Sequence, residues 1–153
     1  MQLAKFRYSL QSILNIKIKM ETQAKQAFSA AQNALLEEQE RLEVLERRKA
    51  EYEQEAGRLR TGSLHIRDIE DNKNAILQMG RLILEQQEQV AAAEARVEEA
   101  REALAEVVKE RKTHETLKEK AFEAFLQEEN KLESKAIDEL TSYTYGRKKA
   151  GEN

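Results

Sequence analysis

Apolar residues recur at heptad spacing through the first part of the chain. Counted from Leu14, they fill the a positions Leu14, Phe28, Leu35, Leu42 and Ala56 and the d positions Leu3, Leu10, Ala24, Ala31, Leu45, Tyr52 and Leu59. The repeat holds over more than seven heptads, whereas three or four already indicate a coiled coil. We call the a and d positions the seam. The pattern predicts a helix over residues 4–58 that packs its seam against a second helix.

Polar residues interrupt this first seam at five positions, which are Arg7, Lys17, Glu21, Glu38 and Lys49. Polar seam residues lower the stability of a coiled coil but fix its register. The interruptions therefore indicate a regulated or dynamic helix pair rather than a maximally stable one.

A second heptad run follows after a gap. Its a positions are Ile69, Ile76, Ile83, Val90, Val97 and Leu104, then Arg111 and Lys118, then Phe125 and Leu132. Its d positions are Asn72, Met79, Gln86, Ala93, Ala100, Val107, His114 and Ala121, and the small ones would let two helices approach closely. This run predicts a helix over residues 64–145, followed by a flexible tail over residues 146–153.

The segment from Gly57 to Ser63 separates the two runs and holds two of the five glycines. Glycine commonly ends a helix, and a serine just beyond it can cap the next one. We therefore predict an all-α fold, a two-helix antiparallel coiled-coil hairpin with a tip at 57–63 and a longer second helix, as one domain over residues 1–153. Folding at the tip pairs Leu10 with a residue near His114, so the helix beyond about residue 116, with the apolar cluster Phe122, Phe125 and Leu126, has no helix opposite it.

Two groups of apolar residues lie outside the seam. Near the start, a stripe of g positions runs beside it, with Ile16 and Ile18 further round: Phe6, Ile13, Met20, Ala27 and Ala34. It could serve self-association, pack under the tail of the second helix, or bind a partner. Near the tip, Leu77 and Leu84 at b and Leu82 at g suggest a docking stripe. A third helix from another copy, or scattered surface leucines, would explain them equally well.

Composition and charge narrow the class further. Charged residues make up 36% and aromatic residues 5%, and there is no proline and no cysteine. The chain therefore has little material for a globular core and no means to form a disulfide or a cysteine-ligated metal site. We expect no signal peptide and no direct membrane insertion, because no apolar run approaches the roughly 20 residues that a span needs. Any association with a membrane must then come through a partner.

Basic residues gather at the start of the chain. Residues 1–30 contain five basic residues and only one acidic residue, a glutamate. Arg147, Lys148 and Lys149 follow near the other terminus, which the hairpin would bring to the same end. We expect this basic end to bind an acidic or hydroxyl-rich partner, with simple solvation as the alternative. Charge reversal at Lys5, Arg7, Lys17 and Lys19 should then weaken binding of that partner.

Catalytic chemistry is not indicated, and we expect no enzyme, cofactor or metal site. The spacing Gly57-x-x-x-x-Gly62 resembles a phosphate loop, but Ser63 stands where the lysine belongs and no strand precedes it. His65 and His114 have no set of ligands nearby. A net charge of −3 and the lack of a basic, aromatic stripe argue against nucleic acid.

The two ends of the chain carry specific motifs. The start reads Lys5-Phe6-Arg7-Tyr8-Ser9-Leu10-Gln11-Ser12-Ile13-Leu14-Asn15-Ile16-Lys17, followed by Met20-Glu21. This start resembles that of the flagellar export protein FliJ family, which opens with an aromatic-basic-aromatic element, a Leu-x-x-Leu-Leu motif, a basic residue and a glutamate. The end, Glu133-Ser134-Lys135-Ala136-Ile137-Asp138-Glu139-Leu140, then Tyr143 and Arg147-Lys148-Lys149, is similar to its closing segment.

This resemblance implies a small cytoplasmic component of the flagellar type III export apparatus, associated peripherally with the inner membrane and serving flagellum biogenesis and, through it, chemotaxis. The implied partners are a hexameric export ATPase, into which the coiled coil inserts as a stalk, the cytoplasmic domain of the export-gate membrane protein, and substrate chaperones that some members escort. We expect Phe6, Arg7, Leu10, Ile13, Lys17 and Arg147 to face the ATPase, and Leu77, Leu82 and Leu84 to face the gate or a chaperone.

Alternatives to this function are the central stalk of a virulence-type secretion system or rotary ATPase, a self-associating structural coiled coil, and a holdase binding unfolded substrates through Phe122, Phe125 and Leu126. The hexamer that co-purifies would identify a stalk of another system. Self-association without an effect on the ATPase would indicate a structural coiled coil, and binding of unfolded export substrates would indicate a holdase.

Overall fold

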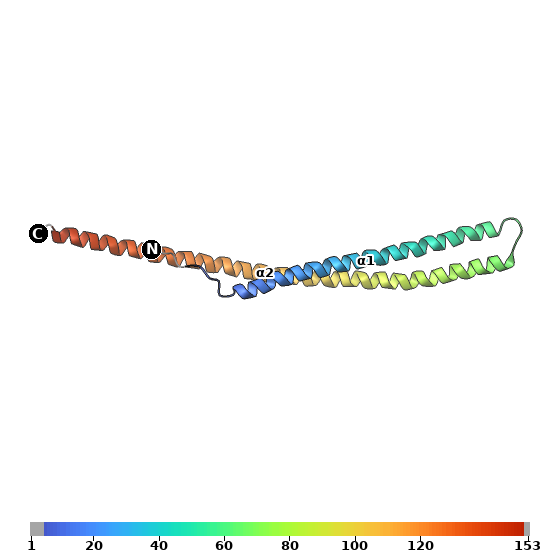
Figure 1. Cartoon of the computed structure of the whole chain (residues 1–153), viewed down its shortest axis with the longest axis horizontal. Helices are drawn as coiled ribbons and strands as arrows, with labels where there is room; N and C mark the ends of the chain where they lie inside the picture. Colours follow the sequence, from blue (N-terminus) through green and yellow to red (C-terminus); the bar gives the residue numbers. More distant parts are fainter. Residues whose placement is uncertain (1–4, 152–153) are drawn as a thin grey trace. The chain divides into compact units, whose positions relative to one another are not determined.

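The computed structural model describes residues 5–151, with side chains up to residue 147. It contains two α-helices, α1 (Gln11–Leu59) of 49 residues and α2 (Ile66–Gly151) of 86 residues, which pack against each other (Figure 1). The predicted all-α class with a longer second helix is confirmed. Lys148, Lys149 and the last two residues of the predicted tail, and Leu3 of the predicted seam, fall outside the residues whose side chains are described.

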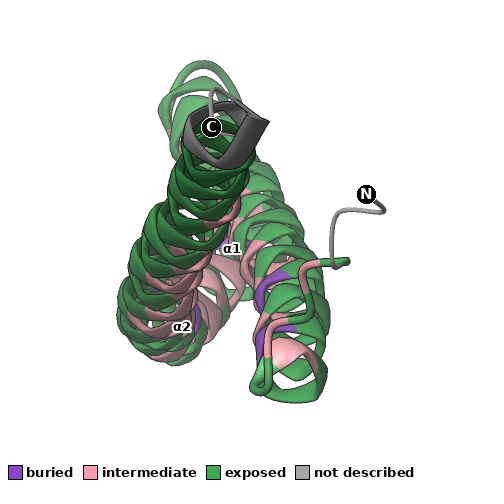
Figure 2. Cartoon of the chain, turned by 90° about the vertical axis from the view of Figure 1, so that its left-hand side faces the viewer, coloured by how far each residue is buried: buried purple, intermediate pink, exposed green. Residues whose placement is uncertain are grey.

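The predicted seam matches the burial along both helices. Nearly all of its described positions are buried or half-buried, and these lie on the sides where α1 and α2 face each other (Figure 2). Arg7, Leu10, Tyr52 and Leu132 are the exposed exceptions. Pairs far apart in sequence, such as Asn72 with the Tyr52 carbonyl and Gln86 with Glu38, show the two helices to be antiparallel.

The start of α1 differs from the prediction. The helix begins at Gln11 rather than at residue 4, and residues 5–10 are not helical. The Gln11 N–H donates to the Tyr8 carbonyl at 3.1 Å, which closes a turn in front of the helix. Basic residues in a first helical turn oppose the helix macrodipole, so extending α1 back through Arg7 and Lys5 would gain little. The extended path instead lets Phe6 reach α2.

The turn between the helices lies later than predicted. Gly57 is still helical, α1 continues to Leu59, and Gly62 is the residue with a left-handed backbone, at φ 78°. The Thr61 hydroxyl donates to the Arg58 carbonyl at 2.9 Å, so it satisfies one of the last carbonyls of α1. The first carbonyl of the next helix belongs to His65, which accepts from the Ile69 N–H, so Ser63 does not occupy the predicted capping position.

The end of α2 also differs from the prediction. The helix runs through residue 145 to Gly151, so most of the predicted flexible tail is helical. A single glycine in a helix costs only about 1 kcal/mol relative to alanine, and with no proline in the chain Gly146 alone does not end the helix.

The chain divides into two compact units, which we describe separately. The tip unit spans Thr22–Glu106, and the terminal unit comprises the chain up to Glu21 together with Val107 onwards. The single-domain assignment stays a prediction. In the tip unit the centre of the seam is formed by Ala93 and Val97, both buried. The guanidinium of Arg101 lies 5.9 Å from the centre of the Phe28 ring and covers a seam aromatic.

Candidate partner-binding surfaces

Three aromatic rings hold the non-helical N-terminal segment on α2. The Phe6 ring centre lies 5.1 Å from that of Phe122, edge to face, and 5.4 Å from that of Phe125. We call these three residues the aromatic clasp. As predicted, no helix of the described chain lies opposite Phe122 and Phe125. The non-helical segment packs there instead, because an extended chain reaches further along α2 than a helix would. Of the alternatives for Phe6, packing under the tail of α2 is the one observed.

The segment beside the clasp is basic. A shallow hollow there is lined by Phe6, Arg7, Tyr8, Gln11 and Lys118, with two cations and no carboxylate among them. Arg7 is exposed. Leu10, just before α1, and Ile13, in the first turn of α1, are each 39% exposed. The structure therefore brings Phe6, Arg7, Leu10 and Ile13 together in one stretch of the terminal unit.

Lys17 forms an ion pair within the chain. Its Nζ donates to Oε2 of Glu110 at 2.8 Å. One turn on, buried Glu21 pairs with Arg111, which also donates to Oε2 of Glu115 at 2.7 Å. The hydrogen bonds to Glu115 and Glu21 raise the pKa of Arg111, so this side chain stays a cation.

Arg147 lies apart from the other residues predicted to face the ATPase. It is exposed near the end of α2, and at 1.5 Å rise per residue it lies about 33 Å along the helix from Phe125. Arg147 therefore belongs to the same terminal unit as Phe6 but lies well along α2 from the aromatic clasp.

The three leucines near the tip do not form one surface. Leu77 and Leu84 are seven residues apart on one side of α2 and are 57% and 64% exposed. Leu82 is half-buried and belongs to a g position, on the other side of the seam. The pair Leu77 and Leu84 is therefore the exposed feature, and Leu82 contributes to packing.

A match to a family model shows which protein family the chain belongs to. The family model described as "Flagellar FliJ protein" matches residues 6–150. The chain belongs to the FliJ family. FliJ membership implies a stalk component of the type III export apparatus, and proteins of the family are generally non-catalytic.

A solved structure shows the same fold as this FliJ-family chain. It is described as a YscO homolog, CT670, from Chlamydia trachomatis, and it matches with 24% sequence identity and a TM-score of 0.67, over 95% of this chain and 98% of that one. Comparison with curated proteins found no match. Within the described residues, no helix of the FliJ-family chain is long and apolar enough to cross a membrane, and no group of three or more histidine or acidic residues is placed to hold a metal ion.

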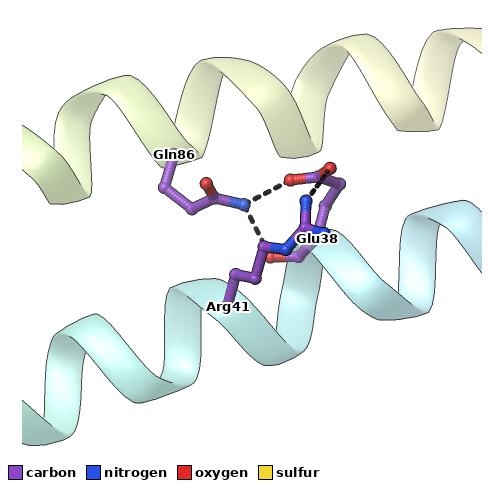
Figure 3. A network of polar contacts seen from close by, with 3 residues as sticks. All are labelled: Glu38, Arg41 and Gln86. Carbon is purple, nitrogen blue, oxygen red and sulfur yellow. Dashed lines mark hydrogen bonds and ion pairs between the residues drawn. The ribbon is translucent and has the colours of Figure 1, made fainter.

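The polar pairs across the seam were not foreseen as pairs. In Figure 3 the Gln86 amide reaches across to Glu38, donating to its backbone carbonyl at 2.9 Å and to its carboxylate, which Arg41 also contacts. Asn72 donates to the Tyr52 carbonyl at 2.9 Å. The sequence did carry a signal, because Glu21 and Arg111 are seam residues of opposite charge on the two helices. Matching such interruptions across the predicted fold would have found that pair.

Proposed function

We propose that this FliJ-family chain is a non-enzymatic stalk that inserts into the hexameric flagellar export ATPase, promotes its assembly and activity, and links it to the export gate. It would act in the cytoplasm, attached to the inner membrane only through the export apparatus. The supporting observation is the surface of the terminal unit, where exposed Leu10, Ile13 and Ile16 lie in the same stretch as the basic residues Lys5 and Arg7. An apolar and basic surface fits the acidic or hydroxyl-rich lining of a protein ring.

The ionic pairs of α1 and α2 add to this surface. Glu21 is neutralised by Arg111, so the only carboxylate of the first 30 residues contributes little negative potential there. Of the predicted contact residues, Arg7, Leu10 and Ile13 are accessible, Phe6 positions the segment through the aromatic clasp, and Lys17 can reach a partner only by leaving Glu110. Arg147 would contact a different level of the ring.

The test is hydrolysis and hexamer formation by the purified export ATPase with added chain. We expect stimulation by the native chain and at least a tenfold weaker effect from Ile13→Ser/Ile16→Ser. Leu36→Ser is the matched control, because Leu36 is as exposed as Ile16 but belongs to the tip unit. Stimulation that is absent, or equal for all three proteins, would rule the proposal out.

The gate is the second proposed partner, and the surface that supports it is exposed Leu77 with Leu84. An escorted chaperone is the competing occupant of this surface. A stalk in a virulence-type secretion system is a second candidate function, supported by the likeness to the YscO homolog. Binding to the ATPase of that system and not to the flagellar one would decide for it.

A further inference from the structure

Two hollows flank the seam near the end of the tip unit, and they differ in charge. One is lined by Ala56, Leu59, Arg60, Ile69, Asn72, Lys73, Ile76 and Leu77. The other is lined by Tyr52, Glu55, Leu59, Asp68, Asp71, Asn72 and Ala75. They share only the seam residues Leu59 and Asn72, so they lie on opposite sides of it. We call the first the basic tip groove, since its lining holds two cations and no carboxylate, whereas the second holds three carboxylates and no cation.

The basic tip groove has an apolar floor and uncompensated cations. Leu59, Ile69 and Ile76 form the floor, and among the described residues neither Arg60 nor Lys73 makes an ion pair. The amide of Asn72, the other polar lining residue, is already used by the Tyr52 carbonyl. The charge that the lining of this groove offers to a ligand is therefore positive.

The groove continues along α2 as a strip with a glycine in its middle. Leu77, Gly80 and Leu84 are spaced three and four residues apart, which places them on one face of the helix, the face that also carries Lys73. Both leucines are exposed, and Glu70, exposed one helical repeat earlier, borders the strip on the tip side.

No contact within the described part of the chain explains Gly80. It lies inside a long helix, where glycine lowers stability relative to alanine, and a Cβ placed on it would meet no atom within 4 Å. The open space above it, between two exposed leucines, would let a second backbone approach closely.

We propose that the basic tip groove and the Leu77–Gly80–Leu84 strip bind an acidic amphipathic helix of a partner protein. Apolar side chains of that helix cover the groove floor and the two leucines, its carboxylates pair with Arg60 and Lys73, and its backbone passes over Gly80. The acidic hollow on the other side of the seam repels the same helix, so charge selects the side as well as the partner. The inference rests on the proposed function in treating Leu77 and Leu84 as a docking surface, and it adds the chemistry of the occupant.

The first test uses a synthetic probe. A labelled 18-residue helical peptide with leucines at three- and four-residue spacing and flanking glutamates is titrated with the full chain, beside a peptide with lysines in place of the glutamates. We expect the glutamate peptide to bind at least tenfold more tightly at low salt and to lose affinity as salt rises. Leu77→Ser/Leu84→Ser should lower its affinity at least tenfold, and Arg60→Glu/Lys73→Glu should reverse the preference. Equal binding of both peptides, or no effect of these variants, would overturn the proposal.

Gly80 supplies a test in which stability and binding change in opposite directions. Gly80→Ala should raise the melting temperature by roughly 2–4 °C, because alanine favours the helix. The same substitution should weaken binding of the glutamate peptide, and Gly80→Gln should weaken that binding further. Gly146→Ala is the matched control, since Gly146 is also helical with open space around it, and it should leave peptide binding unchanged. Unchanged binding by Gly80→Gln would contradict the close approach.

Two further measurements separate this inference from the proposed function. If the cytoplasmic domain of the export gate binds through Leu77 and Leu84 but the glutamate peptide does not bind, the inference fails and the proposed function stands. If the peptide binds and the affinity of the gate domain is unchanged by Leu77→Ser/Leu84→Ser, the groove has another acidic occupant and the gate assignment fails. Sedimentation that shows dimers lost in Leu77→Ser/Leu84→Ser, without peptide binding, would assign the strip to a second copy and overturn the inference.

Discussion

Glu21 occupies an a position of the seam, is only 9% exposed, and has Arg111 opposite it on α2. A buried carboxylate without a partner is costly, whereas a buried pair contributes little net stability and can be replaced by apolar residues. The pair is therefore better understood as a device that sets which residues of α1 and α2 lie opposite each other.

Replacing one member of this pair should cost more than replacing both. Arg111→Leu removes the cation that lies opposite buried Glu21 on α2, and we expect it to lower the free energy of unfolding by about 3 kcal/mol. Glu21→Leu/Arg111→Leu should recover most of that loss. Urea unfolding followed by helical circular dichroism measures both, and equal losses in the single and double variants would contradict this role of the pair.

Phe6 is the residue that ties the non-helical segment to α2. Aromatic pairs contribute about 0.5–1.5 kcal/mol each, and Phe6 makes two. Phe6→Ala should therefore release the segment without unfolding the helices, and tryptic cleavage after Arg7 should become roughly tenfold faster. Leu132→Ala, at an exposed α2 position outside the clasp, is the control. Cleavage at the native rate would show that the clasp does not hold the segment.

At the scale of the helices, the two seams could be predicted from sequence but their ends could not. Apolar repeats such as Ile69, Ile76 and Ile83 fix which face is buried, because a coiled coil needs the same periodicity throughout. The ends depend on local competition. Phe6 gains more by packing on α2 than by extending α1, and Gly62 rather than Gly57 takes the left-handed conformation. Such choices depend on contacts between distant residues, which periodicity does not report.

The same reasoning explains what was missed at the candidate sites. Exposure of Leu77 and Leu84 followed from their b positions, whereas Leu82, which was predicted to face the same partner, is half-buried. The engagement of Lys17 by Glu110 did not follow, because it needs the exact pairing of α1 with α2.

That pairing should depend on the polar seam residues. Glu38→Leu/Gln86→Leu replaces a polar contact in the tip unit by apolar side chains, which should preserve or raise stability but relax the register. The chain has no cysteine, so disulfide formation between two introduced cysteines reports which residues of α1 and α2 lie opposite each other. With the native seam, Ala31→Cys/Ala93→Cys should oxidise readily and Ala31→Cys/Ala100→Cys, one heptad off, should not. In the leucine variant we expect both pairs to form, and selective oxidation of the first alone would show that apolar packing already sets the register.

At the scale of the whole molecule, the proposed function assigns different partners to different units. The ATPase surface, with Ile13 and Ile16, belongs to the terminal unit, and Leu77 and Leu84 belong to the tip unit. Substitutions at distant sites without shared contacts are usually additive. Each set of variants should then affect one partner and leave the other unchanged.

This separation can be measured with four proteins: the native chain, Ile13→Ser/Ile16→Ser, Leu77→Ser/Leu84→Ser, and the combination of both. We expect the terminal variant to lose at least tenfold in ATPase stimulation and to keep native affinity for the gate domain, and the tip variant to do the reverse. The combined protein should show both losses with unchanged helicity, since all four side chains are exposed. If the tip variant also loses ATPase stimulation, the two surfaces are coupled, and a stalk that only joins independent partners no longer describes the protein. Because the substitutions touch no seam residue, such coupling would have to pass through the packing of α1 on α2, and the register-relaxed Glu38→Leu/Gln86→Leu chain should then weaken it.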